Sequence, residues 1–141
     1  MPTKIIIVDD DPIHHKMINL LIKLSELEIQ SNSFFQASDA LTYILENNEV
    51  EALPDLILLD LSMPLVSGWG FLELFEAVVP RLIKPVDVII LTSSISSEDK
   101  ERASNYNCVK GFFSKPLTEA ILKDITSSSF TSVNRTSKYY N

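Results

Sequence analysis

Two short runs of the sequence contain only apolar residues, and each run is followed directly by aspartate. Residues 5–8 read Ile-Ile-Ile-Val and precede Asp9, and residues 56–59 read Leu-Ile-Leu-Leu and precede Asp60. Four apolar residues without alternation are typical of a strand whose two faces are both buried, as in parallel sheets. The runs at 29–35, 86–91 and 109–113 predict three further strands, of which the first is the weakest.

Helical patterns follow these runs and predict helices over residues 12–24, from Ser38 or Asp39 to 45, and over 71–78, 97–105 and 118–125. In the first helix we expect Asp11 to be the N-cap and Pro12 to occupy the first helical position. The apolar face is expected to consist of Ile13, Met17, Leu20, Leu21 and Leu24. The adjacent His14 and His15 are expected on the helix surface, since neighbouring side chains point about 100° apart and cannot chelate one ion together.

Alternating strands and helices predict an α/β fold, with a doubly wound, five-stranded parallel sheet and right-handed crossovers. A length of 141 residues corresponds to one domain. We expect the domain to span residues 1–125. Residues 126–141 are rich in Ser and Thr without periodicity, which predicts a flexible C-terminal tail.

The charge balance excludes several classes of function. Twelve Lys and Arg stand against 19 Asp and Glu, giving a formal net charge of −7, which argues against binding DNA or an anionic membrane surface.

The single Cys108 excludes an internal disulfide and a zinc site built from several cysteines. Residues 5–8 are too short for a secretory signal, and no apolar run approaches the ~20 residues of a membrane helix. We therefore expect a soluble, cytoplasmic domain.

Polar residues stand at the ends of four of the predicted strands: Asp9 and Asp10, Asp60, Thr92, and Lys115. The carboxyl ends of parallel strands meet at one edge of the sheet, where α/β proteins bind ligands. Two carboxylates ~4 Å apart repel by about 4 kcal/mol at an effective dielectric constant of ~20. A hard divalent cation such as Mg²⁺ relieves this repulsion. Taken singly, each residue has an ordinary interpretation as a cap or turn residue, but their joint occurrence at strand ends favours a metal site.

Four separated motifs carry a resemblance to a known family. They are Val8-Asp9-Asp10-Asp11-Pro12, then Asp60-Leu61-Ser62-Met63-Pro64 with Gly68, then Leu91-Thr92-Ser93, and finally Lys115-Pro116. In this order they resemble the response-regulator receiver domain of two-component signalling, over residues 4 to about 125. The resemblance implies a flavodoxin-like fold with five helices and strand order 2-1-3-4-5.

The resemblance also implies a Mg²⁺-dependent phosphorylation site. Asp60 would accept the phosphoryl group and contact the metal, Asp10 would ligate Mg²⁺ directly, and Asp9 would assist through water. The main-chain carbonyl of Ser62 would be a further metal ligand. Thr92 would hydrogen-bond the phosphoryl oxygens, and Lys115 would pair with the phosphorylated carboxylate.

Further positions bear on how phosphorylation would change the conformation of such a site and on how fast its acyl phosphate would be hydrolysed. Family members often carry Tyr or Phe two residues before the Ser-Lys pair, and here Phe112 is either a switch residue without a hydroxyl or a plain core aromatic. Ser62 and Ser94 each follow a site residue by two positions. We expect these small hydroxyl side chains to leave an attacking water less well positioned than an acidic or amide side chain would.

By this resemblance, the chain is a phosphoacceptor response regulator in a phosphorelay, without an output domain of its own. Its partners would be a sensor histidine kinase or histidine phosphotransfer protein and a downstream protein target. The target would bind the last helix, the last strand and the helix at 97–105. The protein would not be an enzyme beyond catalysing its own phosphorylation and dephosphorylation. Two alternatives remain: a phosphatase of the haloacid dehalogenase type, against which Ser62 counts because that class needs a carboxylate there, and a receiver-like module that no longer takes phosphate.

Overall fold

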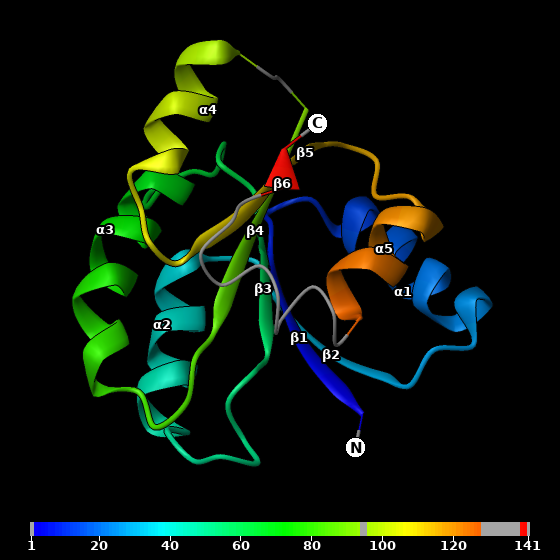
Figure 1. Ribbon diagram of the computed structural model, residues 1–141, viewed down its shortest axis with the longest axis horizontal. Helices are drawn as coiled ribbons and strands as arrows, with labels where there is room; N and C mark the ends of the chain where they lie inside the picture. Colours follow the sequence, from blue (N-terminus) through cyan, green and yellow to red (C-terminus); the bar gives the residue numbers. More distant parts are fainter. Residues whose placement is uncertain (1, 94–95, 128–138, 141) are drawn as a thin grey trace.

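Six strands and five α-helices alternate along the chain in the computed structural model, which describes residues 2–93, 96–127 and 139–140 (Figure 1). The strands are β1 (Thr3–Val8), β2 (Ile29–Phe34), β3 (Leu56–Leu59), β4 (Asp87–Thr92), β5 (Val109–Ser114) and β6 (Tyr139–Tyr140). The helices are α1 (Pro12–Ser25), α2 (Ala37–Glu46), α3 (Gly68–Val78), α4 (Ser97–Ser104) and α5 (Glu119–Thr126), with a 3₁₀ turn, η1 (Val79–Arg81), after α3.

The strands form one parallel sheet in the order β2-β1-β3-β4-β5-β6. The first five strands follow the predicted order 2-1-3-4-5. Val8 pairs with Leu59, and Leu59 pairs with Ile90, so that β1, β3 and β4 end almost level with one another. This register brings the residues that follow these strands to one edge of the sheet.

Helices cover both faces of the sheet, as the apolar runs predict. Helices α1 and α5 lie on one face, and α2, α3 and α4 lie on the other (Figure 1). Ile5 and Ile7 pack into the core under α1 and α5, whereas Ile6 and Val8 pack into the core under α2 and α3. Burial on both faces is the reason why residues 5–8 are apolar without alternation.

Helix α1 presents a different face to the sheet from the one predicted. Its cap is as expected, since Asp11 Oδ1 accepts a hydrogen bond from the backbone N–H of Ile13 and Pro12 begins the helix. The buried side chains, however, are those of His14, His15, Ile18 and Ile22. Four of the five residues assigned to the apolar face are exposed: Ile13, Met17, Leu20 and Leu24. Both sets of residues recur at helical spacing, and periodicity alone cannot decide between them.

Two other boundaries differ from the sequence predictions. Helix α2 begins at Ala37 after Gln36, rather than after a cap at Ser38 or Asp39, and Gln36 makes no side-chain cap hydrogen bond. In the C-terminal segment, Tyr139 and Tyr140 pair with Gly111 and Phe112 as strand β6. Residues 128–138 of the expected tail lie outside the described residues, so its flexibility stays a prediction.

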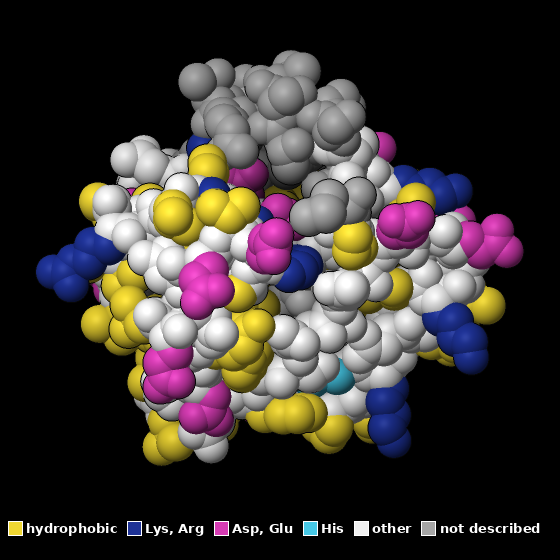
Figure 2. Space-filling view, turned by 90° about the horizontal axis from the view of Figure 1, so that it is seen from below, with side chains coloured by type: hydrophobic (Ala, Val, Ile, Leu, Met, Phe, Trp, Pro, Cys, Tyr) yellow, Lys and Arg dark blue, Asp and Glu magenta, His cyan; other side chains and the backbone are white. Residues whose placement is uncertain are grey.

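Charged and hydrophobic side chains are intermixed at the surface. On the face shown in Figure 2, Lys and Arg side chains stand apart from one another, with acidic and hydrophobic side chains between them. Within the described parts of the chain, every helix falls short of the length and apolar character that crossing a bilayer requires. The cytoplasmic location stays a prediction from the sequence.

Gly68 is the first residue of α3 and lies against the backbone that follows β3. Its backbone N–H donates to the carbonyl of Leu61 at 3.0 Å. A Cβ at this position would lie 2.4 Å from the backbone oxygen of Asp60 and 2.6 Å from Cα of Leu61. These backbone atoms cannot rotate away, so a glycine is required for α3 to approach the strand end that carries Asp60.

We predict that Gly68→Ala lowers the free energy of unfolding by about 1–3 kcal/mol, because the added methyl group forces the two backbones apart. Gly70→Ala is the matched control. Its Cβ would contact only the Val66 and Ser67 side chains, at 3.0 Å and beyond. Alanine also gains roughly 0.5–1 kcal/mol over glycine inside a helix. Urea unfolding of both variants checks this, and equal stability of the two would contradict the close approach.

Candidate functional site

Three carboxylates meet at the carboxyl edge of the sheet. Asp9 and Asp10 follow β1, and Asp60 follows β3. One oxygen from each side chain lies within 4.8 Å of the others, with Asp9 and Asp60 buried and Asp10 exposed. The structure therefore brings together the three acidic residues that the sequence placed at strand ends.

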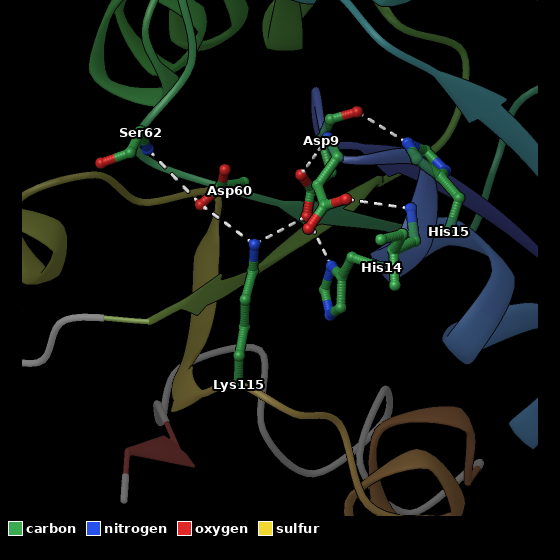
Figure 3. Close-up of polar contacts among 8 residues, drawn as sticks. Asp9, His14, His15, Asp60, Ser62 and Lys115 are labelled. Carbon is green, nitrogen blue, oxygen red and sulfur yellow. Dashed lines mark hydrogen bonds and ion pairs between the residues drawn. The ribbon is translucent and has the colours of Figure 1, made fainter.

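Lys115 joins this cluster from the end of β5, but it lies closer to Asp9 than to Asp60. Its Nζ is 2.8 Å from Asp9 Oδ2 and 3.6 Å from Asp60 Oδ1 (Figure 3). The backbone N–H of Lys115 donates to the carbonyl of Thr92 at 2.8 Å, which fixes the end of β5 beside that of β4. The ammonium group thus compensates the more deeply buried of the two carboxylates, since Asp9 is 1% and Asp60 6% exposed.

Asp9 accepts from three hydrogen-bond donors in addition to Lys115. Its Oδ1 accepts from the backbone N–H of Asp11 at 2.9 Å, and its Oδ2 accepts from His14 Nδ1 at 2.5 Å as well as from Lys115. His15 Nε2 donates to the backbone carbonyl of Asp9 at 2.7 Å. The predicted surface position of the two histidines is therefore wrong, because both rings turn inward toward Asp9 (Figure 3).

The donors determine the charge on Asp9. Burial on its own would raise the pKa of this carboxyl group, but the hydrogen bonds from His14, Lys115 and the Asp11 backbone outweigh burial and lower the pKa to about 2. Asp9 is consequently ionised throughout the physiological range.

Asp60 has the opposite electrostatic environment. Burial raises its pKa above the ordinary value, and the negative charges of Asp9 and Asp10 raise it further. The charge of Lys115 and the backbone N–H of Ser62, 3.4 Å from Asp60 Oδ1, act in the other direction without cancelling the rise. The charged form of Asp60 is therefore less well stabilised than that of Asp9.

The remaining predicted residues lie around this cluster. Thr92 is buried at the end of β4, and Ser62 is exposed in the loop after Asp60. Phe112 is fully buried in the core under α2, α3 and α4, where it packs as a core aromatic residue. Ser94 lies outside the described residues. The functional roles assigned to all these residues stay predictions.

The acidic cluster has the donor set of a hard cation. All three converging atoms are carboxylate oxygens, which are the ligands that Mg²⁺ prefers, and the exposed Asp10 leaves one side open to water. The site therefore fits Mg²⁺ in the chemistry of its donors.

Sequence reasoning missed His14 and His15 as part of this site. The signal was their spacing from Asp9: residues five and six positions later lie in the first turns of a helix that begins at the same strand end. Such a helix can turn its N-terminal side chains back onto the residue that precedes it. The sequence alone does not show that the helix is rotated to do so.

Comparison with known proteins decides the family. The profile of the response regulator receiver domain matches residues 5–127, which is most of the chain. The chain belongs to the response regulator receiver domain family. Its fold, with the first five strands in the order 2-1-3-4-5, is the one expected of a receiver domain.

Individual receiver proteins show the same relationship. The polar-differentiation response regulator DivK of Brucella anthropi is 30% identical over 119 residues, covering 84% of this chain and 88% of DivK. The two-component response regulator ORR1 of Oryza sativa subsp. japonica is 28% identical over 121 residues, covering 82% of this chain. The matched segment is 50% of ORR1, so the chain spans about half the length of that relative.

A solved structure supports the fold. The two-component response regulator from Cytophaga hutchinsonii superimposes with a TM-score of 0.80 at 24% identity, covering 88% of this chain and 93% of the other. At this level of identity the likeness concerns the fold.

We predict that Asp60→Asn stabilises this receiver domain at neutral pH. The folded pKa of Asp60 is raised above the value of 3.8 for an unperturbed carboxyl group, so ionisation costs folding free energy, and asparagine removes that cost. The stabilisation should shrink as the pH falls through the raised pKa and vanish below about 3.8.

Asp9→Asn is the matched comparison, with the opposite sign. Its lowered pKa contributes stability at neutral pH that is lost only as the pH falls toward about 2. Urea unfolding at pH 7.5 and pH 4 measures both effects. A destabilised Asp60→Asn protein at pH 7.5 would contradict the electrostatic assignment.

Proposed function

We propose that this receiver domain accepts a phosphoryl group on Asp60 from a phosphohistidine, in a reaction that depends on Mg²⁺. The donor would be a sensor histidine kinase or a histidine phosphotransfer protein. Phosphorylation then changes the surface presented to a downstream protein target. The observation that carries this proposal is the convergence of Asp60 with Asp9 and Asp10 within 4.8 Å, with Lys115 at the same edge.

Asp60 is the carboxylate best suited to be the nucleophile. Asp9 has both oxygens occupied by donors, whereas Asp60 makes longer contacts, to the backbone N–H of Ser62 at 3.4 Å and to Lys115 Nζ at 3.6 Å. A carboxylate oxygen of Asp60 forms the new bond to phosphorus as the phosphorus–nitrogen bond to the donor imidazole breaks and its electron pair returns to the imidazole nitrogen. The product is an acyl phosphate on Asp60 and a free histidine on the donor.

The metal would be held by Asp10, Asp60 and the main-chain carbonyl of Ser62, with Asp9 assisting through water. Bound there, Mg²⁺ supplies positive charge that offsets the negative charge of the transferring phosphoryl group. Other side chains of the site would contribute through their charges. Asp9 and Asp10 keep the site negative enough to select a divalent cation, and Lys115 supplies a second positive charge beside Asp60.

Thr92 and Lys115 would transmit phosphorylation to the surface. An acyl phosphate on Asp60 carries about −1.5 to −2 charge, in place of the −1 of the ionised carboxylate. We expect Lys115 to shift from Asp9 toward the phosphoryl oxygens and the Thr92 hydroxyl to hydrogen-bond them. The two residues are linked through the backbone, so their movements rearrange the loops after β4 and β5 together.

The surface that responds would be formed by α4, β5 and α5. Helix α4 buries little apolar surface against the rest of the domain, because Ala103 is its one buried residue. Elements with few buried apolar contacts rearrange at low cost in free energy. Phe112 would take part only if its ring leaves the buried position it holds here. A downstream target that binds this surface would read the phosphorylated state.

We predict that incubation with acetyl phosphate and Mg²⁺ adds a single phosphoryl group, about 80 Da, to Asp60, and that removing Mg²⁺ with a chelator prevents this. Intact-protein mass spectrometry measures the gain. Asp60→Asn should gain nothing, while Asp124→Asn, which changes an exposed carboxylate on α5, should behave as the wild type. Multiple turnover of phosphate esters would indicate a phosphatase instead, and an unchanged mass would indicate a module that no longer takes phosphate.

We predict that Ser62→Asn shortens the lifetime of the acyl phosphate about tenfold, which corresponds to roughly 1.4 kcal/mol of activation free energy. The exposed Ser62 lies next to the acceptor, and its short hydroxyl group reaches less far toward an attacking water than an amide does. Decay of ³²P-labelled protein after removal of the donor measures the rate. An unchanged rate would contradict the expectation that this position shapes hydrolysis.

A further inference from the structure

The two adjacent histidines of α1 converge on one residue of the site. His14 and His15 are 6% and 4% exposed, although helix positions one apart point in different directions. They achieve this convergence by contacting different parts of Asp9. Nδ1 of His14 donates to the carboxylate oxygen Oδ2 at 2.5 Å, and Nε2 of His15 donates to the main-chain carbonyl at 2.7 Å.

Packing alone does not require histidine at these positions, although the His15 ring lies against Phe35 with ring centroids 4.4 Å apart. His14 Nε2 and His15 Nδ1, the second nitrogen of each ring, are buried and have no hydrogen-bond partner among the described residues. A buried polar atom without a partner costs free energy that an apolar side chain of similar size would not incur. The feature that compensates for this cost is the hydrogen bond each ring makes to Asp9.

The bond from His14 shares its acceptor with Lys115. Both donate to Asp9 Oδ2, at 2.5 and 2.8 Å. Lys115 is on a long flexible side chain and also lies near Asp60, whereas His14 is fixed by its place in the first turns of a packed helix. If Lys115 shifts to a phosphorylated Asp60, His14 remains as the donor that keeps Oδ2 from being buried without a partner.

We propose that His14 and His15 are positioning residues for Asp9, an inference that rests on the proposed function. His14 and the backbone N–H of Asp11 fix the rotation of the Asp9 carboxylate through its two oxygens, and His15 fixes the backbone of the same residue. Asp9 thereby keeps the orientation that the divalent cation requires, both before and after Lys115 moves. Hydrogen-bond partners of metal-binding carboxylates tune metal affinity in this way.

Two substitutions of His14 separate hydrogen bonding from packing. His14→Asn places an amide N–H close to the position of Nδ1 and keeps the donor, whereas His14→Leu has comparable bulk and no donor. Mg²⁺ affinity is measured by isothermal titration calorimetry on the unphosphorylated protein, and the Mg²⁺ dependence of phosphorylation by acetyl phosphate is measured in parallel. We expect His14→Leu to weaken Mg²⁺ binding by about 10–100-fold. His14→Asn should restore most of the loss.

Ile22→Ala controls for destabilisation of the helix. Ile22 lies on the buried face of α1, two turns and about 12 Å along the helix axis after His14. This variant should lower the melting temperature and leave the Mg²⁺ affinity unchanged. Because of it, a loss of affinity in His14→Leu can be assigned to the missing donor and not to reduced stability.

Nitrogen NMR of the imidazole rings gives a readout that does not involve the metal. The hydrogen bonds require the proton on Nδ1 of His14 and on Nε2 of His15, and we expect the two rings to show these opposite tautomers. The positioning role would be overturned by the reverse tautomer at His14, or by a Mg²⁺ affinity of His14→Leu equal to that of the wild type. In either case a wild-type protein that still gains a phosphoryl group would leave the proposed function standing. A wild-type protein that binds no Mg²⁺ and gains no phosphoryl group would instead overturn the proposed function itself.

Discussion

Mutual repulsion among three carboxylates at one sheet edge is the constraint around which the rest of this site is arranged. Parallel strands β1 and β3 end level, so the residues after them cannot avoid one another. Lys115, the His14 and His15 rings and the backbone of Asp11 all act on the same member of the cluster, Asp9. The outcome is one carboxylate that is firmly ionised and one, Asp60, that carries its charge at a cost in folding free energy.

This asymmetry links electrostatics to chemistry. The pKa of Asp9 is lowered to about 2 by hydrogen bonds that outweigh burial, and that of Asp60 is raised by burial and by its acidic neighbours. A well-solvated or well-bonded carboxylate is a poor nucleophile because its electron pairs are already engaged. Of the two buried carboxylates, Asp60 is the one whose charge the protein compensates less. The proposed cation and the proposed bond to phosphorus would both reduce this uncompensated charge.

The apolar runs and strand-end residues were sufficient to predict the sheet and the gathering of Asp9, Asp10 and Asp60. The rotation of α1 was not predictable, because Ile13 and Met17 recur at the same helical spacing as His14 and Ile18. The rotation is accompanied by tertiary contacts: among the described residues the histidine rings bond to Asp9, and Ile18 and Ile22 pack into the core. The resemblance pairs Lys115 with the phosphorylated form of Asp60; without a phosphoryl group, Lys115 Nζ lies nearer to Asp9 than to Asp60.

We infer that phosphorylation of Asp60 controls which carboxylate Lys115 contacts, and that His14 holds Asp9 in either case. A crystal structure with Mg²⁺ and beryllium trifluoride, which forms an analogue of the acyl phosphate on the acceptor carboxylate, tests this most directly. We predict that Lys115 Nζ no longer contacts Asp9 and instead contacts a fluorine atom of the beryllium trifluoride bound to Asp60. The hydrogen bond from His14 Nδ1 to Asp9 Oδ2 should be retained. If Lys115 Nζ instead remains on Asp9 beside a modified Asp60, the modified carboxylate does not draw Lys115 away and this inference is wrong.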